Sequence, residues 1–233
     1  MKIIYWSDYA CPYCYIGETR LKKAVREMGL ENEVEFEARA FELDPEAPTT
    51  VQTTTDIRFA KKYQLSLEGA RAKIEQISNL GREEGIDFRY ATTLYTNTCD
   101  AHRLTKLAQS KNVPALADKV SELLFDAYFT RNEKLADRDV LLRVAKDAGM
   151  DAEEVNSMLD SDRFIDDVRY DEREAMLRGV RGVPYFVIDD LVSIPGAISV
   201  RAMKGVLNRA IEAKAKPAEE EHPHQCGPDG CRI

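Results

Sequence analysis

The N-terminal region contains the segment Lys2-Ile3-Ile4-Tyr5-Trp6-Ser7-Asp8-Tyr9-Ala10-Cys11-Pro12-Tyr13-Cys14, from which the predicted fold follows. Residues 2–6 are rich in β-branched and aromatic side chains, which is typical of a short buried strand. Downstream of the segment, apolar residues recur at the i, i+3, i+4, i+7 spacing of one helical face, at Leu21, Ala24, Val25 and Met28. The two cysteines therefore lie at a junction between a strand and a helix.

This junction gives the two cysteines different chemistry. Pro12 suits the first helical position, because its missing N–H would have no partner there. Cys11 would then cap the helix, beside free backbone N–H groups and the positive end of the helix dipole, where a thiolate is stabilised. Cys14 lies in the first turn, within reach of a disulfide with Cys11. We expect Cys11 to be exposed and to attack a substrate, and Cys14 to be more buried and to resolve the mixed disulfide.

Two other interpretations of this Cys-x-x-Cys motif are half of a zinc site and a structural disulfide. A zinc site needs two further ligands at matched spacing, and no second pair lies nearby in the sequence. A structural disulfide is typical of secreted proteins, whereas this chain shows no secretion signal. Because Cys-x-x-Cys between a strand and a helix is a specific signal, we favour redox chemistry.

The overall composition is that of an ordinary globular protein. The chain has 233 residues, 44% of them hydrophobic and 32% charged, which suits one large domain or one domain with a sizeable insertion. Its net charge of −8 argues against a nucleic-acid-binding surface, which needs basic clusters. No apolar run approaches the ~18 residues that span a bilayer, and Asp8 interrupts the apolar start before a signal peptide could form. We therefore expect a cytoplasmic protein with no nucleic-acid or membrane partner, whose cysteines are mostly thiols at rest.

The rest of the chain predicts an α/β fold with a helical insertion. Residues 33–39 alternate polar and apolar side chains, so strand, helix and strand form a βαβ unit with parallel strands. After a proline-containing loop at 44–48, the sequence is almost entirely helical from 51 to 178. Predicted helix starts within it are Ser66, Pro114, Asp137, Asp151 and Asp162.

Strand character returns near the C-terminus. Residues 184–188 and 191–194 are two short strands separated by Asp189-Asp190, which predicts an antiparallel hairpin, and a helix capped by Ser199 follows. We therefore predict one domain from 1–48 and 179–213 and an inserted helical domain at 49–178. The Ala, Lys, Pro and Glu composition of 214–233 predicts a flexible tail.

The order βαβ, helical insertion, ββα, with Cys-x-x-Cys at the first helix, resembles a thioredoxin fold interrupted by helices, as in the DsbA family. The sequence is most similar to the cytoplasmic FrnE-like branch, described as dithiol–disulfide oxidoreductases or isomerases. The matching motifs are Ser7-Asp8 before Cys11-Pro12-Tyr13-Cys14, Asn97-Thr98 with Ala101-His102-Arg103, and Gly179-Val180-Arg181-Gly182-Val183-Pro184-Tyr185-Phe186-Val187. The likeness spans most of residues 1–210, more weakly in the insertion. It implies disulfide exchange with protein or peptide thiols, with glutathione as a further candidate partner, and no cofactor.

The resemblance also assigns a substrate-binding role to Val183 and Pro184, beside Pro12 and Tyr13. In thioredoxin-like proteins, the pair resembling Val183-Pro184 forms a cis peptide bond that faces the active-site cysteines. Proline donates no N–H, and the Val183 backbone can pair with an extended substrate peptide by strand addition. The alternative is an ordinary trans proline at the beginning of an edge strand.

Two other function classes stay open. The related kappa glutathione transferases and 2-hydroxychromene-2-carboxylate isomerases bind glutathione in the same architecture. They resemble a pattern with serine in place of Cys11, so the cysteine pair counts against them. A non-catalytic redox sensor or metal-binding protein is the third hypothesis.

The C-terminal tail carries a second pair of cysteines, Cys226 and Cys231. The intervening Gly-Pro-Asp-Gly favours a turn that would bring the two thiols within disulfide distance. A second redox pair, an inert tail and a zinc site formed with His222 and His224 are the three interpretations. We favour the redox pair, since some FrnE-like proteins carry a comparable C-terminal pair.

Four further residues have less specific roles. Cys99 is expected to be a small buried hydrophobic residue, with Asn97 capping the helix that carries it. His102 is expected to pack or cap within that helix rather than to move a proton. Asp8 either influences the nearby Cys11 thiol or forms a turn.

Overall fold

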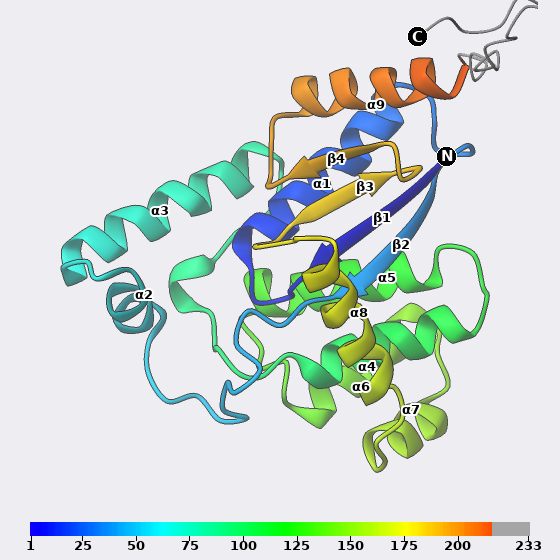
Figure 1. Ribbon diagram of the computed structural model, residues 1–233. Coiled ribbons are helices and arrows are strands. Elements are labelled where there is room, and N and C mark those ends of the chain that lie inside the picture. Colours follow the sequence, from blue (N-terminus) through cyan, green and yellow to red (C-terminus); the bar gives the residue numbers. More distant parts are fainter. Residues whose placement is uncertain (216–233) are drawn as a thin grey trace, which may run out of the picture.

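The structure is a computed structural model that describes residues 1–215. It contains a four-stranded sheet in the order β2-β1-β3-β4, formed by β1 (Lys2–Ser7), β2 (Glu35–Ala40), β3 (Tyr185–Ile188) and β4 (Val192–Pro195) (Figure 1). β1 is parallel to β2, and β3 is antiparallel to both β1 and β4. The predicted βαβ unit and hairpin are confirmed. The predicted tail sites Cys226, Cys231, His222 and His224 lie outside the described residues.

Helices cover both faces of the sheet (Figure 1). On one face, α1 (Pro12–Glu27) and α9 (Val200–Ala215) pack against Ile3 and Tyr5 of β1. The alternate residues Ile4 and Trp6 point to the other face, where they pack near α8 (Ile165–Leu177). The period of two along a strand thus divides β1 between two layers of core.

A buried acidic residue ties α8 to the sheet. Asp171 is fully buried, and its carboxylate accepts a hydrogen bond from Ala40 N at 2.8 Å and pairs with Arg39 Nη1 at 2.9 Å. Lys106 Nζ also pairs with this carboxylate, and Trp6 Nε1 donates to the Asp171 carbonyl at 2.9 Å. The buried charge is therefore fully partnered, and it fixes where α8 crosses the edge of β2.

The segment between β2 and β3 is helical, as predicted. It comprises α2 (Thr55–Tyr63), α3 (Leu67–Glu83), the 3-10 turn η1 (Tyr90–Thr92), α4 (Cys99–Ser110), α5 (Leu116–Phe125), the π-helical turn η2 (Asp126–Thr130), α6 (Arg138–Ala148), α7 (Ala152–Leu159) and α8. Its main core is continuous with the residues around the two N-terminal cysteines; for example, the rings of Tyr15 and Phe125 stack at 4.9 Å. The division into an inserted domain stays a prediction.

Most predicted helix starts are confirmed by their caps. Ser66 Oγ accepts from Gly69 N, and the carboxylates of Asp137 and Asp151 accept from the first turns of α6 and α7. Two were wrong. α8 begins three residues after Asp162, because a turn closed by Ile165 N and the Asp162 carbonyl comes first. α5 begins two residues after Pro114, since Ala115 adopts a left-handed conformation with φ of 60°.

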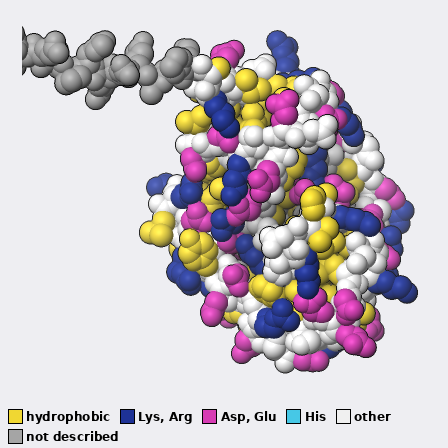
Figure 2. Space-filling model, turned by 90° about the vertical axis from the view of Figure 1, so that its right-hand side faces the viewer, with side chains coloured by type: hydrophobic (Ala, Val, Ile, Leu, Met, Phe, Trp, Pro, Cys, Tyr) yellow, Lys and Arg dark blue, Asp and Glu magenta, His cyan; other side chains and the backbone are white. Residues whose placement is uncertain are grey.

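The surface carries mixed charge. On the face shown in Figure 2, basic and acidic side chains are interspersed with scattered hydrophobic ones, so this face has no continuous basic region of the kind that nucleic acid needs. Within residues 1–215, no helix combines the length and apolar character needed to cross a membrane.

Candidate active site

Cys11 lies where the sequence predicted it, at the N-cap of α1. Its backbone is extended, with φ of −92° and ψ of 115°, and Pro12 is the first helical residue. Cys11 N donates to the Asp8 carbonyl at 2.9 Å, while the Cys11 carbonyl accepts from Cys14 N at 3.1 Å. These bonds hold the Cys11 side chain beside the free N–H groups of the first helical turn.

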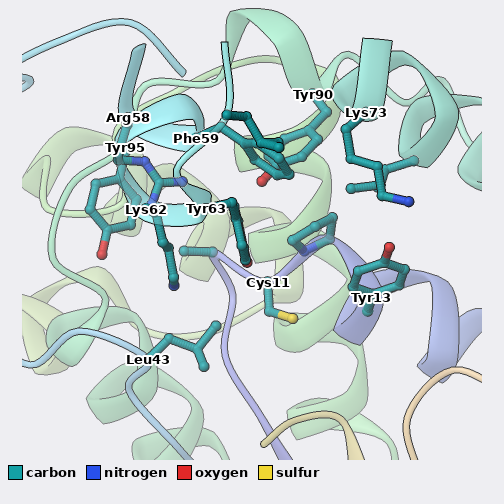
Figure 3. A pocket seen from close by; sticks show the side chains of 14 residues that line it. Cys11, Tyr13, Leu43, Arg58, Phe59, Lys62, Tyr63, Lys73, Tyr90 and Tyr95 are labelled. Atoms are coloured by element: carbon teal, nitrogen blue, oxygen red, sulfur yellow. The ribbon is translucent and has the colours of Figure 1, made fainter. Parts of the chain in front are cut away.

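The expected exposure of Cys11 was wrong. Only 4% of the residue is exposed, because the helical segment folds over the N-terminus of α1. The thiol instead lies in the wall of a cavity of about 310 Å³ that is also lined by Pro12 and Tyr13 (Figure 3). A reacting partner must therefore reach the sulfur through this cavity.

Cys14 is fully buried, as predicted, although Cys11 is buried as well and the expected difference in exposure is therefore small. Its Sγ accepts a hydrogen bond from Asp8 N at 3.5 Å. Burial, together with the neighbouring Cys11, raises the pKa of the Cys14 thiol well above its ordinary value. At neutral pH Cys14 is thus held as a thiol while its partner is free to react.

The Val183–Pro184 bond is cis, and it faces Cys11. The Cys11 thiol donates to the Val183 carbonyl at 3.7 Å, so residues 172 positions apart in sequence meet at the sulfur. α1 comes close to this segment because it carries Gly17, where an added Cβ would lie 2.8 Å from Pro184 Cγ. The structure therefore brings together all six residues predicted for the N-terminal site. Their roles in exchange stay predictions.

The cavity walls were not predicted. They come from α2, α3, η1 and the loops beside them, together with the loops that follow β1 and β2. Most are aromatic or aliphatic: Ala10, Leu43, Phe59, Tyr63, Leu65, Ile77, Tyr90 and Tyr95. Three are basic, namely Arg58, Lys62 and Lys73 (Figure 3). The available signal was the spacing in 55–63, where Arg58 and Lys62, like Phe59 and Tyr63, are four residues apart and share one side of a helix.

Asp8 organises the loop beneath the cavity. Its two carboxylate oxygens accept from Ala10 N at 3.0 Å and Leu43 N at 2.7 Å, and burial raises its pKa. His102 Nε2 lies 3.9 Å from the same carboxylate, but burial lowers the pKa of His102 to about 3. The neutral imidazole packs against the tilted Tyr9 ring, with the two ring centroids 4.8 Å apart, which is the packing role expected for it.

A second buried carboxylate, Glu18, was missed. It lies one turn after Cys14 and accepts from Ser7 Oγ at 2.6 Å and Ser121 Oγ at 3.4 Å. Burial raises its pKa to about 7, although Lys22 and the Ser7 hydrogen bond act in the opposite direction. The signal was an acidic residue on the apolar face of α1, three positions before Leu21.

Cys99 is half-buried at the start of α4, where its N–H donates to Asn97 Oδ1 at 2.8 Å. Burial raises the pKa of its thiol to about 11, as for an unreactive packing residue. Over the described part of the chain, no three His, Cys, Asp or Glu side chains cluster as metal ligands would.

Comparison with known proteins identifies the family. Residues 2–208 match the model of the DSBA-like thioredoxin domain. The chain belongs to this family. The structure of the probable DsbA oxidoreductase SCO1869 from Streptomyces coelicolor is similar to it, at 32% identity and a TM-score of 0.86, over 100% of this chain and 99% of that one. This relationship confirms the thioredoxin fold with a helical insertion, while the FrnE-like subtype stays a prediction.

More distant structures share the fold. A 2-hydroxychromene-2-carboxylate isomerase has 15% identity and a TM-score of 0.70, covering 92% of this chain and 98% of that one. The cytosolic disulfide reductase DsbM from Pseudomonas aeruginosa, solved with GSH, has 14% identity and a TM-score of 0.60, with the same coverage. At such identities the likeness concerns architecture alone.

Proposed function

We propose that this member of the DSBA-like family is a thiol–disulfide oxidoreductase that exchanges disulfides with protein or peptide substrates. The observation that carries the proposal is the pairing of two unlike thiols. Cys11 lies at a helix N-terminus in a cavity wall, and Cys14 is buried one turn later with a raised pKa. This is the arrangement in which one thiol attacks and the other resolves.

The exchange proceeds in two displacements. The Cys11 thiolate attacks one sulfur of the substrate disulfide, which forms a mixed disulfide and expels the other substrate sulfur as a thiolate, and that thiolate takes up a proton. Cys14 then gives up its proton and attacks Cys11 Sγ, which forms the Cys11–Cys14 disulfide and releases the second substrate thiol. Two electrons pass from the protein to the substrate, and the reverse sequence oxidises a substrate dithiol.

The Val183 carbonyl has a defined part in this scheme. In the thiol form of Cys11, it accepts the S–H hydrogen bond at 3.7 Å. When Cys11 is ionised or bonded to substrate, that bond is lost and the carbonyl is free to accept an N–H from an extended peptide. Pro184, which has no N–H, directs pairing to the Val183 backbone.

Insulin reduction by dithiothreitol tests the proposal. We expect Cys11→Ser to abolish the catalysed rate and Cys14→Ser to accumulate a mixed disulfide with substrate, detectable by mass. Cys99→Ser, which alters a thiol outside the site, should keep full activity. An undiminished rate in Cys11→Ser would rule out the oxidoreductase.

The alternative is a glutathione-dependent enzyme of the transferase or isomerase type. The likeness in fold to 2-hydroxychromene-2-carboxylate isomerase supports it, and the cavity of about 310 Å³ has the size of a small-molecule site. The same proteins can be assayed for glutathione-dependent isomerisation of 2-hydroxychromene-2-carboxylate. Isomerisation that persists in Cys14→Ser would favour the alternative.

A further inference from the structure

The cavity beside Cys11 has an uneven charge distribution. Among the described residues, its lining contains three basic side chains, Arg58, Lys62 and Lys73, and no Asp or Glu. The chain as a whole has a net charge of −8, so this region departs from the average of the protein. A low-polarity wall beside fixed cations raises the local concentration of anions.

The three cations are not neutralised within residues 1–215. None of them takes part in an ion pair there; Lys73 Nζ lies 3.4 Å from the neutral Gln76 Oε1. The Arg58 guanidinium stacks on the Tyr95 ring at 3.7 Å, and its buried Nε has no hydrogen-bond partner in the described chain. The guanidinium is thus held in place by an aromatic ring with donor capacity left over.

Acidic residues beside the cavity are already bound elsewhere. Asp8 accepts from the backbone of Ala10 and Leu43, and Asp44 accepts from Tyr95 Oη at 3.1 Å. Both carboxylates therefore already accept hydrogen bonds from protein donors. Within residues 1–215, neither carboxylate pairs with a cavity cation, so a ligand can supply the neutralising anion.

The cations of the cavity lie on both sides of the Cys11 sulfur. Arg58 and Lys62 are one turn apart on α2, and Lys73 is on α3. In Figure 3 the Lys62 and Lys73 side chains lie to either side of Cys11, and Tyr63 and Tyr90 form the apolar wall between them. A molecule with its disulfide at Cys11 would therefore have groups on both sides of that disulfide within reach of a cation.

We infer that the cavity selects disulfides that carry carboxylate groups close to the reacting sulfur. Arg58, Lys62 and Lys73 bind the carboxylates, and the tyrosine walls bind the apolar part of the substrate. This inference rests on the proposed oxidoreductase function and names its substrate class. The carboxylates can belong to a small anionic disulfide or to acidic residues in an extended peptide, and the experiment includes both.

The test compares matched disulfides. Three of them are disulfides of acetylated and amidated peptides, which have two Glu, two Gln or two Lys next to the cysteine and are otherwise identical. The fourth is glutathione disulfide, which represents the small-molecule source. The rate constant for oxidation of the reduced protein is measured by rapid alkylation and mass analysis, and each value is divided by the rate of the same disulfide with dithiothreitol. At low salt, we expect the Glu peptide to react fastest, the Gln peptide more slowly and the Lys peptide slowest. These differences in rate should shrink at about 0.5 M salt, because salt screens partly exposed charges.

Two double variants localise the effect. Lys62→Gln/Lys73→Gln should slow the Glu peptide about tenfold, about threefold for each partly exposed cation, and leave the Gln peptide unchanged. Lys61→Gln/Lys146→Gln removes the same charge from exposed positions outside the cavity lining and should change neither rate. A faster reaction with glutathione disulfide than with the Glu peptide identifies the small-molecule source, and the opposite order identifies the peptide.

The two levels of inference fail in different ways. If Lys62→Gln/Lys73→Gln keeps the wild-type ratio of Glu to Gln peptide rates, carboxylate selection by the cavity is wrong while disulfide exchange stands. If the wild-type protein oxidises with none of the four disulfides, or if Cys11→Ser does so as fast as wild type, the oxidoreductase proposal itself is wrong.

Discussion

Replacing Glu18 by Gln should change how the stability of the protein depends on pH. Glu18 is 5% exposed and surrounded by Ser7, Ser121, Lys22, Asp118 and Tyr5. Burial raises the pKa of its carboxyl from 4.5 to about 7. Since a tenfold change in proton affinity corresponds to about 1.4 kcal/mol, this rise is equivalent to about 3 kcal/mol between the two protonation states.

The direction in which stability changes with pH follows from the number of protons bound by the folded and the unfolded protein. Between pH 4.5 and about 7, the folded protein keeps a proton on Glu18 that the unfolded chain has released. The free energy of unfolding therefore falls as pH rises through this window, and the loss is complete above pH 7. Glu18→Gln has no proton to lose. Its stability relative to wild type should increase by about 3 kcal/mol between pH 4.5 and pH 8.

Urea unfolding at a series of pH values measures this difference. Glu42, whose pKa burial also raises to about 7, contributes the same slope to both proteins and cancels in the comparison. Glu83→Gln is the matched control, because Glu83 is an exposed residue of α3. Its curve should stay parallel to wild type. If the Glu18→Gln curve is parallel as well, Glu18 is not held as a neutral acid and the reasoning is wrong.

Three further predictions concern packing and the thiols. Gly17→Ala should destabilise the protein by about 1–3 kcal/mol and slow insulin reduction, because the new Cβ meets Pro184 Cγ at 2.8 Å; Gly205→Ala, with open space around its Cβ, should raise the thermal midpoint instead. Asp171→Ala should cost about 3–5 kcal/mol in urea unfolding, since it removes the buried carboxylate that binds Lys106, Arg39 and Ala40 N, and a loss under 1 kcal/mol would contradict the role given to that network. Iodoacetamide at pH 7 should label wild type at a single N-terminal thiol, Cys11; faster labelling of Cys14 would reverse the assigned roles.

Local features of the site could be predicted from the sequence because they depend on neighbouring residues. Pro12 fixes the start of α1, and this places Cys11 at its N-cap whatever surrounds the helix. The Asp189-Asp190 turn is equally local: both residues take positive φ, and Leu191 N closes the turn by donating to the Ile188 carbonyl. The resemblance at Val183-Pro184 added the cis bond, which periodicity alone could not supply.

Tertiary structure alone decided how the thiols are reached and what surrounds them. Cys11 is buried because α2, α3 and η1, at least 44 residues further along the chain, close over it, and helical periodicity does not specify which helix packs where. Glu18 acquires its raised pKa only when α1 packs against β1 and α5, since desolvation depends on every neighbour together. The sequence by itself determined the reactive junction. Long-range packing determined the cavity beside it and placed Arg58, Lys62 and Lys73 in the cavity lining, because residues far apart in sequence meet there.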